Sequence, residues 1–214
     1  MLFFINFKAY RESTGRNAVG LIRSIEEKFG RNPSIVVVVN PLDSMIDTTL
    51  TKFAQTGEPL VPGPYTGHLP VSLLKDYGYS GVMLNHSEFK LEVNKLEESV
   101  GMAKVSGLAT LVCATDMDEI GRIIPLEPDY IAYEPPELIG GNVSVSTEKP
   151  DVIKRAERLL AGKRIRLIVG AGIKNKNDVR VSRELGAEGI LVSSGVVKSP
   201  DPIKVITEMM REVE

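Results

Sequence analysis

The chain has 214 residues, of which 43% are hydrophobic and 25% charged, an ordinary composition for a soluble globular protein. Its formal net charge of −2 gives no electrostatic reason to expect binding to nucleic acid or to an anionic membrane. The single cysteine, Cys113, excludes an intramolecular disulfide, and no stretch reaches the roughly 18 uninterrupted apolar residues of a membrane span. The apolar start Leu2–Phe7 has no basic flank and does not resemble a signal peptide, so we expect a cytoplasmic protein.

The first half of the chain alternates short apolar runs with helical patterns. The apolar runs predict four buried strands, at Leu2–Phe7, Ser34–Val39, Thr51–Gln55 and Gly81–Leu84. Between the strands we expect a helix capped by Ser13 or Thr14 and closed at Gly30, a short helix around Ser44–Leu50, and helical residues over Leu73–Tyr77. The stretch Gly57–Gly67 is rich in proline and glycine and predicts a loop.

The second half continues the same alternation. Its four predicted strands are Thr110–Ala114, Tyr130–Tyr133, Arg166–Val169 and Gly189–Val192. The predicted helices are Lys95–Ser106, a helix capped by Asp116 and running through Ile124, Asp151–Leu160, a helix from Asn175 to about Gly186, and a last helix opened by Ser199-Pro200 and ending near Glu212.

Eight strands alternating with about eight helices predict right-handed βαβ units and a parallel sheet. No linker or shift in composition interrupts the series, so we expect residues 1–214 to form a single α/β domain. A closed (β/α)8 barrel, the TIM barrel, suits this number of units. A doubly wound sheet of the Rossmann or flavodoxin type is the rival, but it has fewer units and a glycine-rich first turn, whereas Asn6-Phe7-Lys8 contains no glycine.

The stretch Asp129–Asn142 carries the strongest chemical signal. The predicted strand Tyr130–Tyr133 ends in the carboxylate of Glu134, and Pro135-Pro136 then stops the strand, while Gly140-Gly141 frees the backbone further along. Aromatic and proline neighbours would partly desolvate Glu134 and raise its pKa into the range of a general base. A base beside a closing lid is therefore predicted; a strand-end carboxylate paired with a lysine is the alternative.

Two further side chains would converge with Glu134, because active sites of such barrels lie at the carboxyl ends of the strands. His86 precedes Ser87-Glu88 and would sit near a helix N-terminus, where the dipole favours the neutral ring that can polarise a carbonyl. Its alternative is a hydrogen-bonded structural histidine, the role we expect for His68. Lys8 follows the first strand and could neutralise a phosphate or enolate, form a Schiff base, or simply be a solvated charge.

Glycine-rich turns follow the seventh and eighth predicted strands, at Gly170-Ala171-Gly172 and Ser193-Ser194-Gly195. Barrels of this kind often bind phosphate at these two turns through backbone N–H groups, and Gly140 could add another. No cluster of cysteine, histidine or carboxylate side chains in the sequence suggests a metal, and Cys113 without a histidine partner is more consistent with packing than with nucleophilic chemistry.

Four motifs in this order resemble the triosephosphate isomerase family, and its archaeal branch in particular. They are Asn6-Phe7-Lys8, Asn85-His86-Ser87-Glu88, Ala132-Tyr133-Glu134-Pro135 with Ile139-Gly140, and Leu191-Val192-Ser193-Ser194-Gly195. The resemblance extends from the first strand to the last helix. It implies an isomerase of glycolysis and gluconeogenesis that interconverts dihydroxyacetone phosphate and glyceraldehyde 3-phosphate through an enediolate, with no cofactor and no metal.

The resemblance also implies roles for individual residues. Glu134 would be the base, His86 the neutral electrophile, and Lys8 and Asn6 would contact the substrate. Glu88 would be a supporting carboxylate beside the site. The phosphate would be held by Ile139, Gly140, Gly172, Ser193 and Ser194. A loop resembling Gly57–Gly67 joins subunits in the family, which implies a homodimer or homotetramer.

The chain departs from the family pattern at two places, the lid and a short segment between the sixth and seventh predicted strands, which suggests a trimmed helix. Gly141-Asn142 replaces the usual Thr-Gly of the lid, and this change predicts a looser open lid and a weaker closed state. Asn85 stands where many relatives have a smaller residue, with an effect that the sequence leaves open. Two other functions are consistent with the same residues: a Schiff-base aldolase that uses Lys8, and a non-catalytic sugar-phosphate binder.

Overall fold

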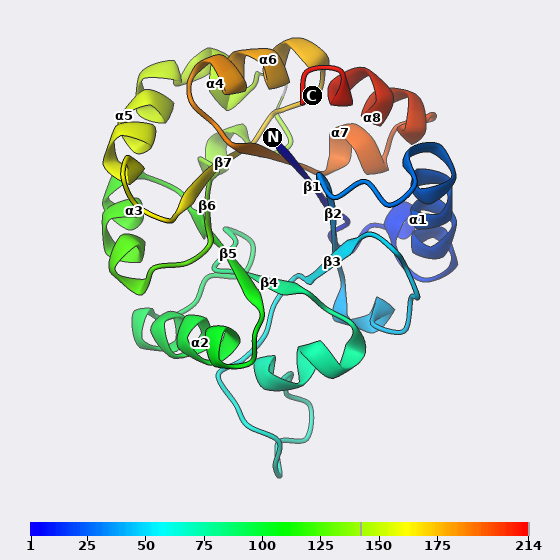
Figure 1. Cartoon of the computed structure of the whole chain (residues 1–214), viewed down its shortest axis with the longest axis vertical. Coiled ribbons are helices and arrows are strands. Elements are labelled where there is room, and N and C mark those ends of the chain that lie inside the picture. Colours follow the sequence, from blue (N-terminus) through cyan, green and yellow to red (C-terminus); the bar gives the residue numbers. More distant parts are fainter. Residues whose placement is uncertain (142, 214) are drawn as a thin grey trace.

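Eight parallel strands close into a barrel in the computed structural model of the chain, which describes residues 1–141 and 143–213 (Figure 1). Each strand pairs with the next along the chain, and β8 pairs with β1. The strands are β1 (Leu2–Asn6), β2 (Ile35–Val39), β3 (Thr51–Ala54), β4 (Gly81–Leu84), β5 (Ala109–Ala114), β6 (Tyr130–Tyr133), β7 (Arg166–Gly170) and β8 (Gly189–Val192). All eight predicted strands and the predicted barrel are therefore confirmed.

The strands are buried on both faces, as their uninterrupted apolar runs predict. Alternate residues fill the inside of the barrel, where the rings of Phe4, Phe53 and Tyr130 pack against one another. Gly81 leaves room for the Phe53 ring of this cluster. Any other residue would place a Cβ 2.4 Å from that ring. The remaining strand residues pack outward against the helices in a second, larger apolar core.

Helices ring the barrel (Figure 1). The α-helices are α1 (Arg16–Phe29), α2 (Val93–Val105), α3 (Met117–Ile123), α4 (Val145–Glu148), α5 (Pro150–Leu160), α6 (Lys176–Glu184), α7 (Ser194–Val197) and α8 (Pro202–Met210). Short 3-10 helices complete the set: η1 (Arg11–Ser13), η2 (Pro41–Asp43), η3 (Val71–Tyr77), η4 (Ile124–Leu126) and η5 (Pro136–Leu138). Between β2 and β4, a part of the chain that is described throughout, every helical segment is of the 3-10 type.

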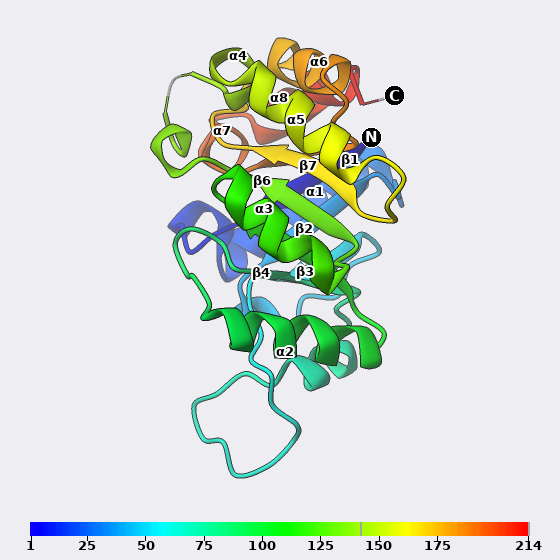
Figure 2. The ribbon, with the colours of Figure 1, turned by 90° about the vertical axis from the view of Figure 1, so that its left-hand side faces the viewer.

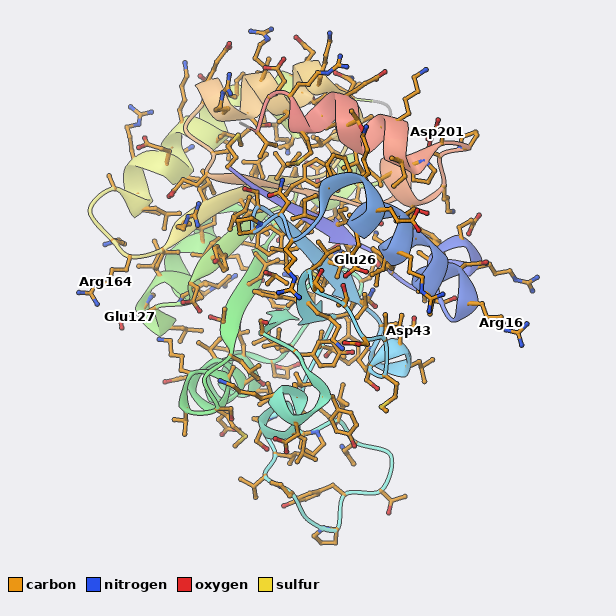
Figure 3. The ribbon with its side chains drawn as sticks, turned by 45° about the vertical axis from the view of Figure 1, so that its right-hand side comes forward. Arg16, Glu26, Asp43, Glu127, Arg164 and Asp201 are labelled. Carbon is orange, nitrogen blue, oxygen red and sulfur yellow. The ribbon has the colours of Figure 1, made fainter. Side chains whose placement is uncertain are left out.

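The predicted helix around Ser44–Leu50 is wrong, since only η2 forms after β2. The buried ammonium of Lys52 donates to the carbonyls of Ser44 and Ile46, which a helix would use for its own bonds. Glu26 of α1 accepts from the backbone of Thr49 and from neighbouring hydroxyls, and Asp43 of η2 accepts from Gly15; both carboxylates are labelled in Figure 3. Side-chain bonds thus replace the helical ladder here.

Two predicted helix starts are also wrong. The hydroxyls of Ser13 and Thr14 donate to the carbonyls of Phe7 and Tyr10, so neither caps α1, which begins at Arg16. The last helix begins at Pro202 with Asp201 as its cap, and Ser199 and Pro200 precede it. Asp116 does cap α3, and Asn175 caps α6 in a reciprocal capping box with Asp178, as the side-chain chemistry predicts.

The stretch Gly57–Gly67 forms the predicted loop, and it extends away from the barrel (Figure 2). Its base is closed by backbone bonds between Glu58 and the chain at Leu69 and Val71. Residues 61–68 are exposed, among them the large side chains of Val61 and Tyr65. Within the described chain, no helix combines the length and the apolar character needed to cross a membrane.

Candidate active site

The carboxyl ends of the strands bring all the predicted site residues to one end of the barrel. One cavity of about 170 Å³ is lined by Asn6, Lys8, Glu88, Glu134, Ile139, Gly140, Gly172, Ser193 and Ser194. His86 lines a neighbouring cavity of about 220 Å³, which shares Asn6, Lys8 and Glu88 with the first. His86 therefore stands at the boundary between the two cavities. Nowhere among the described residues do three His, Cys, Asp or Glu side chains gather as metal ligands would.

Glu134 follows β6 directly and is buried, with 6% of its surface exposed. Its Oε2 lies 3.5 Å from Nε2 of His86 and has no hydrogen-bond partner among the described residues. Burial raises the pKa of Glu134 to about 7, partly opposed by the positive charge of Lys8 and by the thiol of Cys113. A carboxyl group with this pKa can both accept and return a proton near neutral pH.

Gly170, the last residue of β7, makes room for this carboxyl group. A Cβ at Gly170 would lie 2.6 Å from both Cγ and Oε1 of Glu134, well inside contact distance. Only a residue without a side chain allows Glu134 to occupy its observed place. The sequence predicts a phosphate-binding turn at Gly170, and no local pattern of residues indicates its contact with Glu134.

His86 is also buried, with 6% of its surface exposed. The backbone N–H of Glu88 donates to Nδ1 of His86 at 3.1 Å, so Nδ1 is unprotonated and the ring proton is on Nε2, the nitrogen that faces Glu134. Burial lowers the pKa of His86 to about 4, and the charge of Lys8 contributes to the same effect. The ring is therefore neutral at physiological pH and can donate one hydrogen bond through Nε2.

The predicted cause of this neutrality, a helix N-terminus, is wrong. The residues after His86 form a turn in which Phe89 N–H donates to the carbonyl of His86, and α2 begins only at Val93. Desolvation holds the ring neutral instead.

Lys8 reaches the site through a strained backbone, with φ at +50°. Its backbone N–H donates to the side-chain oxygen of Asn6, and Gln55 donates to its carbonyl, so the turn after β1 is held on both sides. The ammonium group lies 2.6 Å from Oε1 of Glu88. Gln55 was not predicted as part of the site; its position at the end of a predicted strand was the only signal for it.

The other end of the 170 Å³ cavity is formed by the turns after β7 and β8. The hydroxyl oxygen of Ser193 is buried and has no hydrogen-bond partner among the described residues. Gly172 has φ at +71°, and a Cβ there would lie 2.1 Å from the carbonyl oxygen of Val143, so this turn packs closely on the loop after β6. Backbone groups and hydroxyls thus face one small space, an arrangement that suits a phosphate.

The predicted lid begins at η5 and passes Ile139 and Gly140 at the cavity wall. Gly140 has φ at +72°, as its predicted flexibility allows. This segment is held by an ion pair between Glu137 and Lys149 and by a bond from Val145 N–H to the carbonyl of Ala171. Of the predicted hinge Gly141-Asn142, Asn142 lies outside the described residues.

Comparisons with known proteins agree with this geometry. The family model described as Triosephosphate isomerase matches residues 1–210. A triosephosphate isomerase of Thermoplasma volcanium is 40% identical over 97% of this chain and 98% of its own length. Those of Caldivirga maquilingensis and Methanocaldococcus jannaschii are 39% and 35% identical, over 98% and 99% of this chain and 96% and 99% of their own lengths. The chain belongs to the triosephosphate isomerase family.

Proposed function

We propose that this chain interconverts dihydroxyacetone phosphate and D-glyceraldehyde 3-phosphate, using Glu134 as the base and His86 as the electrophile. The activity follows from its family. The observation that carries the residue roles is the pair of buried side chains whose pKa values move in opposite directions, that of Glu134 up to about 7 and that of His86 down to about 4.

In the proposed reaction, the carboxylate of Glu134 removes a proton from the carbon beside the substrate carbonyl. Nε2–H of His86 donates a hydrogen bond to the oxygen on which negative charge develops, and the ammonium of Lys8 stabilises the same charge. The protonated Glu134 then returns the proton to the neighbouring carbon, while the hydroxyl proton of the substrate passes to the former carbonyl oxygen by way of Nε2 of His86, which completes the exchange of aldehyde and ketone.

The phosphate of the substrate is proposed to bind where Ser193, Ser194 and Gly172 meet Ile139 and Gly140. The unpartnered Ser193 hydroxyl and the first N–H groups of α7 supply donors there. We propose Asn6 as a substrate contact and Glu88 as the carboxylate that holds Lys8 in place.

A coupled isomerase assay of the wild type and of Glu134→Asp tests the base role. Shortening the side chain by one methylene withdraws the carboxylate from the substrate carbon, and we expect kcat to fall about 10²-fold or more with only a modest change in KM. Equal kcat values in the two proteins would exclude Glu134 as the base. Deuterium uptake from solvent at the substrate carbon, lost in the variant, gives an independent measurement.

A Schiff-base aldolase is disfavoured by the environment of Lys8. Its Nζ lies 2.6 Å from Oε1 of Glu88, so this ion pair occupies the amine that would have to attack a substrate carbonyl. Treatment with borohydride in the presence of substrate would trap a covalent adduct on Lys8 if the aldolase assignment were correct. A non-catalytic sugar-phosphate binder is disfavoured because the proposed base and electrophile, both buried, are present at the same end of the barrel as the ammonium of Lys8.

We also propose that the chain self-associates as a homodimer or homotetramer through the loop Gly57–Gly67. The loop extends from the barrel and exposes Val61 and Tyr65, side chains whose burial against a second copy would favour association (Figure 2). Sedimentation velocity on the active protein tests the proposal, and an active monomer would contradict it.

A further inference from the structure

Asn85, the residue immediately before His86, has a left-handed backbone conformation with φ at +61°. Its side chain is 96% buried, since only 4% of the residue surface is exposed. The side-chain amide nitrogen donates to the carbonyl of Cys113 at 2.9 Å, and the side-chain oxygen accepts from Leu91 N–H at 3.1 Å. One side chain thus joins the end of β4, the end of β5 and the segment that leads into α2.

Glu119 of α3 anchors this amide. Its Oε1 accepts from the Asn85 amide nitrogen at 2.8 Å and from Lys90 Nζ at 2.6 Å, while its Oε2 accepts from both the N–H and the hydroxyl of Thr115. Burial alone would raise the pKa of Glu119, but the bonds from Lys90, Thr115 and Asn85 outweigh it and lower the pKa. The carboxylate is therefore charged, and its hydrogen bond to Asn85 is charge-assisted.

These bonds surround the turn that carries His86. Lys90 Nζ also reaches the carbonyl of Asn85 at 3.3 Å, and Leu91 N–H closes the same turn on the Asn85 side chain. Between these two anchors lie His86 and Glu88, whose N–H fixes the ring of His86. A glycine could adopt the left-handed conformation of Asn85, but it would supply none of these bonds.

We propose that Asn85, anchored by Glu119, is a positioning residue for His86. Its amide holds the turn after β4 so that Nε2 of His86 stays aimed at Glu134 and at the substrate oxygen. Asn85 does not touch the reacting atoms, and its effect on the reaction is transmitted through His86. The inference rests on the proposed isomerase function.

The test compares Asn85→Gly with Asn40→Gly. The first variant keeps the left-handed backbone and removes the amide. Asn40 is a matched control, since it too follows a strand, β2, and its side-chain oxygen accepts from the N–H two residues further on, at Leu42. We expect kcat of Asn85→Gly to fall about 10- to 100-fold with KM changed less than about twofold, and kcat of Asn40→Gly to stay within about twofold of wild type.

A second readout does not depend on turnover. The chain has two histidines, so ¹⁵N spectra of labelled protein resolve the ring nitrogens of His86 from those of exposed His68. We expect wild type to show an unprotonated Nδ1 and a protonated Nε2 for His86, and Asn85→Gly to shift or broaden these signals. Asn40→Gly should leave them unchanged. Unchanged His86 signals in Asn85→Gly, or a loss of thermal stability with wild-type kcat, would overturn the inference.

Glu119→Gln provides a milder variant if Asn85→Gly does not fold. It keeps the size of the side chain but replaces the charged acceptor by a neutral amide, so we expect a smaller fall in kcat and a smaller change in the His86 signals. Wild-type kcat and wild-type signals in Glu119→Gln would count against the inference. If the wild type itself failed to isomerise triose phosphates, the proposed function would fall, while the His86 signals would still decide whether Asn85 positions the ring.

Discussion

The turn after β4 and the loop after β6 carry the two central groups of the site, and they are held in different ways. The β4 turn is fixed by buried side-chain bonds from Asn85 to β5, to α3 and to Leu91. In the β6 loop, none of the described residues from Pro136 to Val143 is buried, and the side-chain tie is a surface ion pair between Glu137 and Lys149. His86, the proposed electrophile, is thus placed by the protein interior, while Glu134, the proposed base, lies at the start of a loosely tied segment.

This difference is useful for an enzyme that must admit and release its substrate. A hydrogen-bond donor works best when its direction is fixed before the reaction begins. A loop that covers the substrate has to open, so exposed bonds worth little energy suit it better than buried ones. Substitutions in the two regions can therefore show whether His86 and Glu134 are held in these different ways.

Replacing His86 removes the rigidly held hydrogen-bond donor in the turn after β4. His86→Gln keeps a donor group, but the more flexible amide is not locked by the Glu88 N–H. We expect kcat to fall about 10²- to 10³-fold with little change in the free energy of unfolding. Steady-state kinetics beside a urea unfolding curve measures both. A variant with wild-type kcat would show that the ring does not polarise the substrate.

Gly170→Ala tests the other region, because it displaces Glu134, the proposed base. The new Cβ would lie 2.6 Å from Glu134 Cγ and Oε1, so the carboxyl group has to shift. We expect kcat to fall about 10- to 100-fold, as for other displacements of about 1 Å at a reacting group. Ala171→Gly, in the same turn, is the control, because it removes a side chain rather than adding one. Equal losses in both variants would point to the turn itself, not to crowding of Glu134.

The buried carboxyl group of Glu134 also predicts a pH effect on stability. Its pKa rises from an ordinary 4.5 to about 7 in the folded protein, so the folded state holds the proton more tightly than the unfolded chain. This contribution is fully present below about pH 4.5 and is lost as the pH rises to about 7. Deprotonation then leaves a charge in a desolvated place, which costs folding energy.

Glu134→Gln removes this titration. We expect the free energy of unfolding of the variant, relative to that of the wild type, to increase from pH 5 to pH 8 by an amount on the order of 3 kcal/mol. Unfolding curves at the two pH values measure the gain. The same titration predicts that kcat/KM of the wild type decreases below about pH 7. A stability difference that does not change with pH would mean that Glu134 titrates near its ordinary pKa.

The smallest effect is expected in the lid. Gly141→Thr restores the residue usual in the family, and we expect slower opening and a change in kcat of only a few fold, because one hinge residue alters a few backbone bonds. The fit is tight, since a Cβ at Gly141 would lie 3.1 Å from the carbonyl oxygen of Leu138. Relaxation-dispersion NMR of lid residues reports the rates. Opening kinetics identical to those of wild type would contradict the predicted role of this position.

The sequence predicts the strands, because each is a short apolar run. It also predicts that the site residues meet at one end of the barrel, because they follow the ends of these runs. Lys8, His86 and Glu134 could be found in this way, since each lies within two residues of the end of an apolar run. The absence of a helix around Ser44–Leu50 could not be predicted from that stretch alone. It depends on hydrogen bonds to Lys52 and Glu26, which lie outside the stretch. Contacts between residues that are distant in the sequence likewise cannot be predicted from the pattern of a short stretch.

The site illustrates the same limit. Gly170 reads as a turn glycine until Glu134 is seen to occupy the space beside it. Asn85 reads as a departure from the family, and its bonds to Cys113 and Glu119 explain how the chain tolerates it. Desolvation, rather than a helix dipole, sets the charge of His86, and burial of this kind depends on the assembled fold.

The burial of the Lys52 ammonium allows local unfolding of this barrel to be measured. Lys52 is 4% exposed and donates to three carbonyls, those of Ser44, Ile46 and Tyr77, in the part of the ring that has only 3-10 helices. An acylating reagent can reach this amine only when that quarter of the barrel opens. The rate of Lys52 labelling therefore reports the rate of local unfolding. Mass spectrometry can measure it, with surface lysines such as Lys154 as a reference.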